Sequence, residues 1–297
     1  MSKTHKKPHI LGIFQNKGGV GKTTITTILA EYAAIIEKKN VLIIDLDMQC
    51  NTSALWLKIE DNNLPPKHPD YDGDPELNER SSVADIYFGK AVMPYSTYIC
   101  EENGYSNYVD VMAGHPVLLE RINSEFSNDS GKIEEKVINR LKDFLEIADL
   151  GDIYDLIILD PAPSKSLIFK SGIRACNSII IPFESEVKSL QGINAMLQVH
   201  QSENYTRSES DKLELIGLCP NKVRLSTNVH KSTLEMLHEK LGKVMFPPDL
   251  YLGLSSAIPD RDITGVSPKS IFHISKSHTA YKQSMAIGKY VMNKIFK

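Results

Sequence analysis

The stretch Gln15-Asn16-Lys17-Gly18-Gly19-Val20-Gly21-Lys22-Thr23-Thr24 decides the fold of this chain. A short apolar run, residues 9–14, precedes it, and helical periodicity follows from residue 23 to residue 37. A strand, a glycine-rich loop ending in Lys-Thr and a helix together are the context of a phosphate-binding loop. Glycines let backbone N–H groups turn toward phosphate oxygens, and the helix N-terminus adds partial positive charge. The stretch therefore predicts a nucleotide-binding P-loop.

Each polar side chain of this loop has an expected partner. We expect Lys22 to neutralise the β- and γ-phosphates, Thr23 to ligate Mg²⁺ and Thr24 to bond the α-phosphate. An ordinary phosphate-binding loop has no need of a further lysine ahead of its glycines. Lys17 is such a lysine, so its presence narrows the kind of nucleotide-dependent switch that this chain can be.

Apolar runs rich in β-branched residues alternate with helical stretches along the chain. They lie at residues 41–45, 154–160, 177–182 and 213–219. Strands that interleave with helices predict an α/β fold, a three-layer α/β/α P-loop NTPase with a mostly parallel, doubly wound sheet. Ligands of such sheets bind beyond the carboxyl ends of the strands, and four polar residues follow strand ends in this way: Lys17, Asp45, Asp160 and Asn221.

Three carboxylates are candidates for metal and water chemistry. Asp45 and Asp47 end one predicted strand and, because strands alternate faces, share a side. We expect them to hold Mg²⁺ through water and to orient or deprotonate the attacking water, although Asp47 alone also fits a helix N-cap. Asp160 ends another apolar run, where burial is costly without a nearby cation such as Mg²⁺. Thr23, Asp45 and Asp160 are therefore the expected metal site.

Composition and charge bound the class of protein. The 297 residues carry ordinary hydrophobic and charged fractions, 41% and 24%. The four cysteines are far apart, in neither metal-ligand nor redox-pair spacing, and no run of about 18 apolar residues occurs, which favours a cytoplasmic protein. Residues 1–164 hold 16 Lys and Arg against 26 Asp and Glu, whereas residues 165–297 hold 18 against 11. The basic second half is either a solvated face or a patch for a polyanion.

One domain is the expected organisation. Residues 1–8 form a basic tail, and residues 9–297 form a single ATPase domain. Residues 61–80, rich in Pro, Asn, Asp and Gly, predict an exposed loop or insertion. Its acidic part, residues 70–79, is either a solvated loop or a receptor for a basic partner peptide.

Several motifs in order resemble the ParA/MinD family of ATPases, most closely its short, Soj-like partition members. Residues 17–24 resemble the deviant Walker A motif, Asp45-Leu-Asp-Met-Gln49 the second acidic motif and Asp160-Pro-Ala-Pro-Ser164 the Walker B motif. Residues 181–192 resemble the segment after the fifth strand, and Pro220-Asn221 is similar to the adenine-side motif. The chain departs from the family at Met48-Gln49-Cys50-Asn51, where Pro-Gln-Gly-Asn is frequent, and at Pro161-Ala162.

The resemblance implies a slow Mg²⁺-dependent ATPase that sandwiches two ATP molecules in a homodimer. Lys17 would cross to the partner's nucleotide, in the manner of an arginine finger supplied in trans, and join Asp45 and Asp47 as a catalytic residue. The implied contacts to ATP or ADP are Lys17, Gly18, Gly19, Val20, Gly21, Lys22, Thr23, Thr24, Asn221, Pro259 and Asp260.

The resemblance also implies a function for the basic second half. Partition members bind DNA without sequence preference as ATP dimers, sit on the nucleoid, and are stimulated by a ParB-like or other adaptor. The cargo is then a plasmid, a chromosome or a protein assembly. No helix-turn-helix precedes residue 9, so we do not expect operator-specific binding. The candidate DNA contacts are Lys222, Arg224, Lys231, Lys269, Lys276 and Lys282.

Three alternatives stay open, and one of them is a non-enzymatic adaptor that is gated by nucleotide. A MinD-like positioning ATPase would bind membrane through the last segment, residues 281–297, where apolar residues alternate with lysines. The same pattern fits a helix that closes the fold with its lysines in water, so membrane is not the expected partner. A metallochaperone or iron–sulfur assembly ATPase would need a cysteine pair, and the sequence has no Cys-x-x-Cys.

Overall fold

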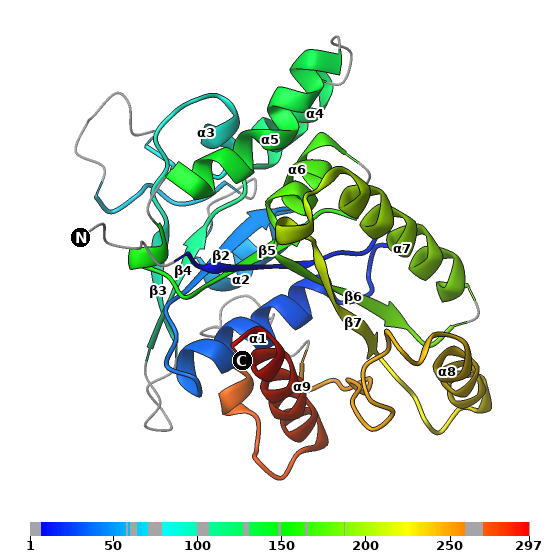
Figure 1. The fold of residues 1–297 in the computed structure, drawn as a ribbon. Helices are drawn as coiled ribbons and strands as arrows, with labels where there is room; N and C mark the ends of the chain where they lie inside the picture. Colours follow the sequence, from blue (N-terminus) through cyan, green and yellow to red (C-terminus); the bar gives the residue numbers. More distant parts are fainter. Residues whose placement is uncertain are drawn as a thin grey trace, which may run out of the picture.

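A seven-stranded sheet forms the centre of the described structure, in the order β3-β4-β2-β5-β1-β6-β7 (Figure 1). The computed structural model describes residues 7–57, 59, 64–70, 79–99, 107–126, 131–147, 150–163, 166–186, 188–258 and 270–296. Neighbouring strands pair in parallel except β3 and β4, which pair antiparallel. The strands are β1 (His9–Ile13), β2 (Val41–Leu46), β3 (Tyr95–Ile99), β4 (Asn107–Met112), β5 (Leu156–Pro161), β6 (Ser178–Glu184) and β7 (Glu214–Asn221).

Helices cover both faces of the sheet (Figure 1). In β2, Leu42 and Ile44 point into one hydrophobic core, and Val41 and Ile43 point into the other. Because successive side chains of a strand face opposite sides, this continuous apolar run serves both cores. The second core lies against α1 (Lys22–Ile35) and α9 (Thr279–Ile295). The first core takes α3 (Ala84–Tyr87), α4 (Pro116–Phe126), α5 (Gly131–Ile147), α6 (Leu167–Ala175), α7 (Ser189–Thr206) and α8 (Asn228–Leu241).

The predicted fold class is confirmed, and the differences lie at the sheet's edge and at one helix end. The strands β3 and β4 were not predicted, because this edge pair includes polar residues such as Ser96 and Asp110 and has no continuous apolar run. The helix expected to reach residue 37 ends at Ile35, and Lys38 beyond it has a left-handed backbone with φ 54°.

The segment at residues 61–80 is described only in part, at residues 64–70 and 79–80. There the backbone N–H of His68 donates to the Glu79 carbonyl at 2.8 Å, and the His68 ring lies 4.7 Å from the Tyr95 ring. These described residues therefore pack against β3, and His68 is only 5% exposed. Within the described ranges, no helix has the combined length and apolar character that crossing a membrane requires.

Candidate nucleotide site

The phosphate loop leaves the carboxyl end of β1 and enters α1 at Lys22. Gly19 and Gly21 have φ values of 75° and 88°, in the left-handed region that favours glycine. A Cβ atom at Gly21 would lie 2.0 Å from the Nδ2 atom of Asn221, so only glycine fits there. Asn221 ends β7 and donates from Nδ2 to the Val20 carbonyl at 2.7 Å. This buried amide ties the loop to the sheet, and its role toward adenine stays a prediction.

The two lysines of the loop lie in different surroundings. Lys22 is 7% exposed, and burial lowers its pKa while the negative charges of Asp160 and Asp47 oppose that shift. The side chain of Lys17 is 41% exposed. Its Nζ atom donates to Glu186 at 3.0 Å and lies 3.9 Å from Glu184, at the end of β6. One lysine therefore serves the cradle, and the other reaches the surface.

Asp45 and Asp160 are direct register partners on the neighbouring strands β2 and β5. The Oδ2 atom of Asp160 accepts hydrogen bonds from the hydroxyls of Thr23 and Thr52, both at 2.6 Å. Its Oδ1 atom is buried and accepts no hydrogen bond within the described part of the chain. A buried acceptor without a donor, beside a threonine hydroxyl, fits a hydrated Mg²⁺ ion. The residues present thus suit the expected metal.

Asp45 is fully buried and held by three donors. Its Oδ2 atom accepts from the Ser53 N–H at 2.8 Å and the Ser53 hydroxyl at 2.6 Å, and its Oδ1 atom accepts from the Asp47 N–H at 3.1 Å. Burial, followed by the charge of Asp160, raises the pKa of Asp45 to about 7, against the lowering effect of these hydrogen bonds. Near neutral pH this carboxyl is poised to take up or release a proton.

Asp47 turns the chain after β2. Its Oδ1 atom accepts from the Gln49 N–H at 2.9 Å, and its carbonyl accepts from the Cys50 N–H at 2.9 Å. Cys50 occupies the N-cap position of α2 (Asn51–Trp56), so Asp47 does not cap that helix. At the position where many family members have glycine, Cys50 has a φ of 51° and is buried.

Four polar residues that hold the site residues in place were not predicted from the sequence: Thr52, Ser53, Glu184 and Glu186. A signal existed for the two glutamates, because they lie at or just beyond the carboxyl end of a buried strand, as Asp45 does. Thr52 and Ser53 carried no such signal, since only the tight turn through Cys50 brings them back onto the two aspartates.

The DNA candidates are distributed over two connected segments. Lys222 has a φ of 52° and turns back, so that its ammonium donates to the Gly19 carbonyl and pairs with Glu184 at 3.1 Å. Arg224 and Lys231 are exposed, after β7 and in α8, and Lys276 and Lys282 are exposed near the start of α9. Gln283 of α9 accepts from the Gly253 N–H at 2.9 Å, and Gly253 bridges Val223, which brings the two segments together. Pro259, Asp260 and Lys269 lie outside the described residues.

The loop, its buried lysine and the paired aspartates define a P-loop protein that binds and hydrolyses a nucleoside triphosphate. The profile of the AAA domain matches residues 8–214, and the chain belongs to this family, within its ParA/MinD group of deviant Walker A ATPases that partition or position cargo.

Relatives agree with this assignment, and solved structures share the fold. The chain is 30% identical over 245 residues to an uncharacterized protein of Pseudomonas putida, covering 82% of this chain and 78% of that one. It is 28% identical over 246 residues to the sporulation initiation inhibitor protein Soj of Bacillus subtilis, covering 82% and 85%. An ATP complex of a Cyanothece McdA variant shares its fold with a TM-score of 0.72 and 17% identity, covering 96% of this chain and 97% of that one. The structure of pNOB8 ParA bound to nonspecific DNA shares the fold with a TM-score of 0.68 and 21% identity, covering 97% of this chain and 99% of that one.

Proposed function

We propose that this protein is an Mg²⁺-dependent ATPase that dimerises around two ATP molecules, binds DNA without sequence preference in that state, and positions a plasmid, a chromosome or a protein cargo. The contrast between buried Lys22 and exposed Lys17 carries the proposal. A lysine for each chain's own phosphates is already present, so a second, exposed lysine is available for another chain's nucleotide. The likeness to Soj and to pNOB8 ParA bound to nonspecific DNA supports the same function.

Within one protomer, the residues divide the work on ATP. Lys22 and the backbone N–H groups of the loop bind the phosphates. Thr23 and Asp160 would hold Mg²⁺, which when bound neutralises charge on the phosphate oxygens. Asp45 or Asp47 orients the attacking water.

Lys17 would complete the site of the partner protomer. In this structure Glu186 holds the ammonium within the same chain, at the surface. Exposed ion pairs contribute about 0–1 kcal/mol, so a second protomer carrying ATP can draw the lysine away. Hydrolysis then depends on two chains, because the group that neutralises charge developing on the phosphates comes from the neighbour.

Exposed apolar side chains follow the exit of β7 along the chain and offer part of a dimer face. Leu225, Val229 and Leu254 are 49%, 57% and 48% exposed. The Leu254 N–H donates to the Val223 carbonyl at 3.0 Å, which places it next to the segment that carries Leu225. Association of two chains would remove such side chains from water. DNA would then meet the nearby cations, with an affinity that falls steeply with salt.

Mixing two inactive variants tests the trans role of Lys17. Lys17→Ala should bind ATP with near-normal affinity but lose DNA- or adaptor-stimulated hydrolysis, since its own cradle is intact. Asp45→Asn supplies Lys17 but lacks the ionisable carboxyl. A mixture should recover hydrolysis in mixed dimers, measured as phosphate release, in proportion to their share. A mixture as inactive as its components, or a normal stimulated rate in Lys17→Ala alone, contradicts the proposal.

A further inference from the structure

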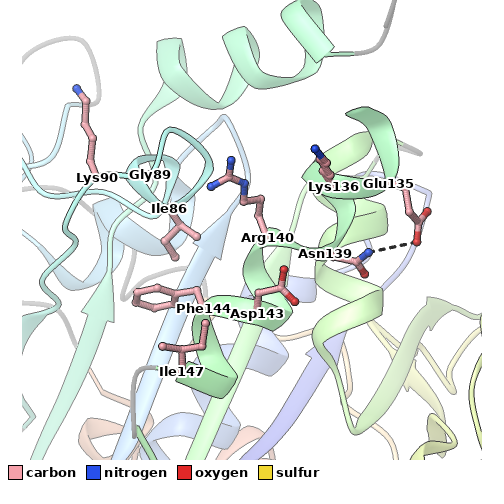
Figure 2. A pocket seen from close by; sticks show the side chains of 10 residues that line it. All are labelled: Ile86, Gly89, Lys90, Glu135, Lys136, Asn139, Arg140, Asp143, Phe144 and Ile147. Atoms are coloured by element: carbon pink, nitrogen blue, oxygen red, sulfur yellow. Dashed lines mark hydrogen bonds between the residues drawn. The ribbon is translucent and has the colours of Figure 1, made fainter. Parts of the chain in front are cut away.

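A groove of about 770 Å³ runs along α5, beside the end of α3, among the helices that cover the first core (Figure 2). Four of its lining residues on α5 follow one another at intervals of three or four: Lys136, Arg140, Phe144 and Ile147. Side chains at this spacing share one face of a helix, and 1.5 Å of rise per residue makes the stripe about 16 Å long. Such a length suits an extended or helical segment of another protein.

The groove has two chemically distinct halves (Figure 2). Arg140 and Lys136 stand at one end of the α5 stripe, and the pocket lining adds Lys90. Phe144 and Ile147 form the other end, next to Ile86 of α3. Ile147 is 79% exposed, so this apolar end lies open to water. An exposed aliphatic side chain beside an aromatic ring is the kind of surface that a partner covers.

Three of the residues that line the groove are cations. Within the described part of the chain, the side chains of Lys90, Lys136 and Arg140 make no ion pair or hydrogen bond. Glu135, which also lines the groove, is already bound to Arg174 at 2.8 Å, and Asp143 is the other acid in the lining. Residues 1–164 carry a net negative charge, with 16 Lys and Arg against 26 Asp and Glu. The charge of the three groove cations is opposite in sign to this net charge.

We propose that this groove docks an acidic, amphipathic segment of a partner protein. Carboxylates of the segment would meet Lys136 and Arg140, where an arginine offers two parallel hydrogen bonds to one carboxylate. Apolar side chains at its other end would cover Phe144 and Ile147. Gly89, two residues beyond α3, leaves space beside the guanidinium: a Cβ atom there would have Arg140 Nη1 at 3.9 Å as its only close neighbour. The groove would recognise this segment as a helix or strand that is acidic at one end and apolar at the other.

Hydrogen bonds connect the groove wall to the carboxylate site. The Val83 N–H, just before α3, donates to the Ala113 carbonyl at 2.8 Å. The next residue, Gly114, donates from its N–H to the Ser53 hydroxyl at 2.9 Å, and that hydroxyl donates to Asp45 at 2.6 Å. A segment docked against α3 therefore contacts an element whose backbone is joined to Asp45.

Binding of a synthetic peptide to the nucleotide-free full chain tests the docking site. The probe is a fluorescein-labelled 15-residue peptide with glutamates in its first half and Leu and Phe in its second, and its control replaces each Glu by Lys. Fluorescence anisotropy should show binding of the acidic peptide alone. Lys136→Glu with Arg140→Glu should weaken binding by roughly tenfold or more, because two exposed charges are reversed. Ile147→Ser should weaken it severalfold.

Matched controls separate docking from general charge effects. Lys240→Glu with Lys243→Glu reverses two exposed cations at the end of α8 and should leave peptide binding within about twofold, since they lie off the groove. Circular dichroism melts should be alike for all variants. Equal binding of both peptides, no binding, or no loss in the α5 double variant overturns the proposal. Retention on phosphatidylserine vesicles that only the α5 variant loses, without peptide binding, would assign the groove to a lipid surface instead.

The connection to Asp45 has its own readout. The acidic peptide should change the ATP hydrolysis rate at least about twofold in the wild type and not in the α5 double variant. This arm rests on the proposed ATPase function, whereas the binding arm does not. An unchanged rate with normal peptide binding contradicts the coupling and leaves the docking site in place.

Discussion

The carboxyl edge of the sheet and the outer surface of α5, α8 and α9 use charge in opposite ways. At the edge, Asp45 and Asp160 are 0% and 1% exposed, and hydroxyls and N–H groups satisfy three of their four oxygens. On the outer surface, Arg140 and Lys282 are exposed. Removing one partner at the edge leaves a buried charge without compensation, which is costly. On the surface no single cation decides binding, because water and salt screen each one.

Lys22→Ala should have the largest effect. The substitution removes a buried cation whose charged form is favoured by the negative charges of Asp160 and Asp47. Nucleotide affinity should fall by roughly 10³-fold or more, or at least about 4 kcal/mol, measured with a fluorescent ATP analogue. Lys17→Ala is the matched control and should stay within severalfold of wild type. Comparable losses in both variants would erase the distinction between the buried and the exposed lysine.

Asp45→Asn should change how stability depends on pH. The folded pKa of Asp45, about 7, lies above the ordinary value of 3.8, so the folded chain holds this proton in a window where the unfolded chain releases it. The wild type therefore loses stability as the pH rises from about 4 to about 7, by roughly 3–4 kcal/mol from this group. The asparagine cannot titrate, so the difference in stability between wild type and variant should shrink or reverse across that window.

Denaturant unfolding in EDTA, without nucleotide, measures this difference at several pH values. The introduced asparagine also brings an amide NH₂, which is a donor, against one of the three donors to residue 45. This lowers the stability of the variant by the same amount at every pH. Only the slope is diagnostic for that reason. Parallel pH profiles for the two proteins would show that Asp45 titrates normally in the folded chain.

The same contrast explains what the sequence predicted and what it did not. Lys22, Asp45 and Asp160 follow apolar strands, and strand ends in a parallel sheet meet at one edge, so a one-dimensional pattern located them. Ser53 holds Asp45 only because the chain turns through the left-handed Cys50. Lys222, expected on a DNA face, turns back onto the phosphate loop through its own left-handed backbone. Chain reversals of this kind depend on tertiary packing and produce no periodic pattern in the sequence.

Surface function was harder to predict for a related reason. The cations of α5 occur at helical spacing, which is also the pattern of any solvated helix face. Only the neighbouring α3 and the exposure of Ile147 distinguish the groove from such a face. Lys282 lies near the segment after β7 only because the Gly253 N–H donates to Gln283, and this contact could not be predicted from the sequence.

Replacing Lys269, Lys276 and Lys282 by glutamate should have an intermediate effect. ATP-dependent retention on random duplex DNA should fall by about 10- to 100-fold, because each reversal removes one phosphate contact and adds repulsion. Dimerisation with ATP, followed by light scattering, should be unchanged. The α5 double variant, Lys136→Glu with Arg140→Glu, is the control and should retain DNA binding. Loss of DNA retention in the control would mean that the two surfaces are not functionally separate.

Glu186→Gln should have the smallest effect, and it tests whether the exposed lysine is restrained within its own chain. The substitution keeps an acceptor near the Lys17 ammonium but removes the charge that pairs with it at 3.0 Å. Since an exposed pair contributes about 0–1 kcal/mol, the ATP concentration needed for dimerisation should fall by no more than about fivefold. Glu184 lies 3.9 Å from the same ammonium and also pairs with Lys222, so it retains part of the restraint. A requirement for more ATP would mean instead that Glu186 orients Lys17 for the partner's nucleotide.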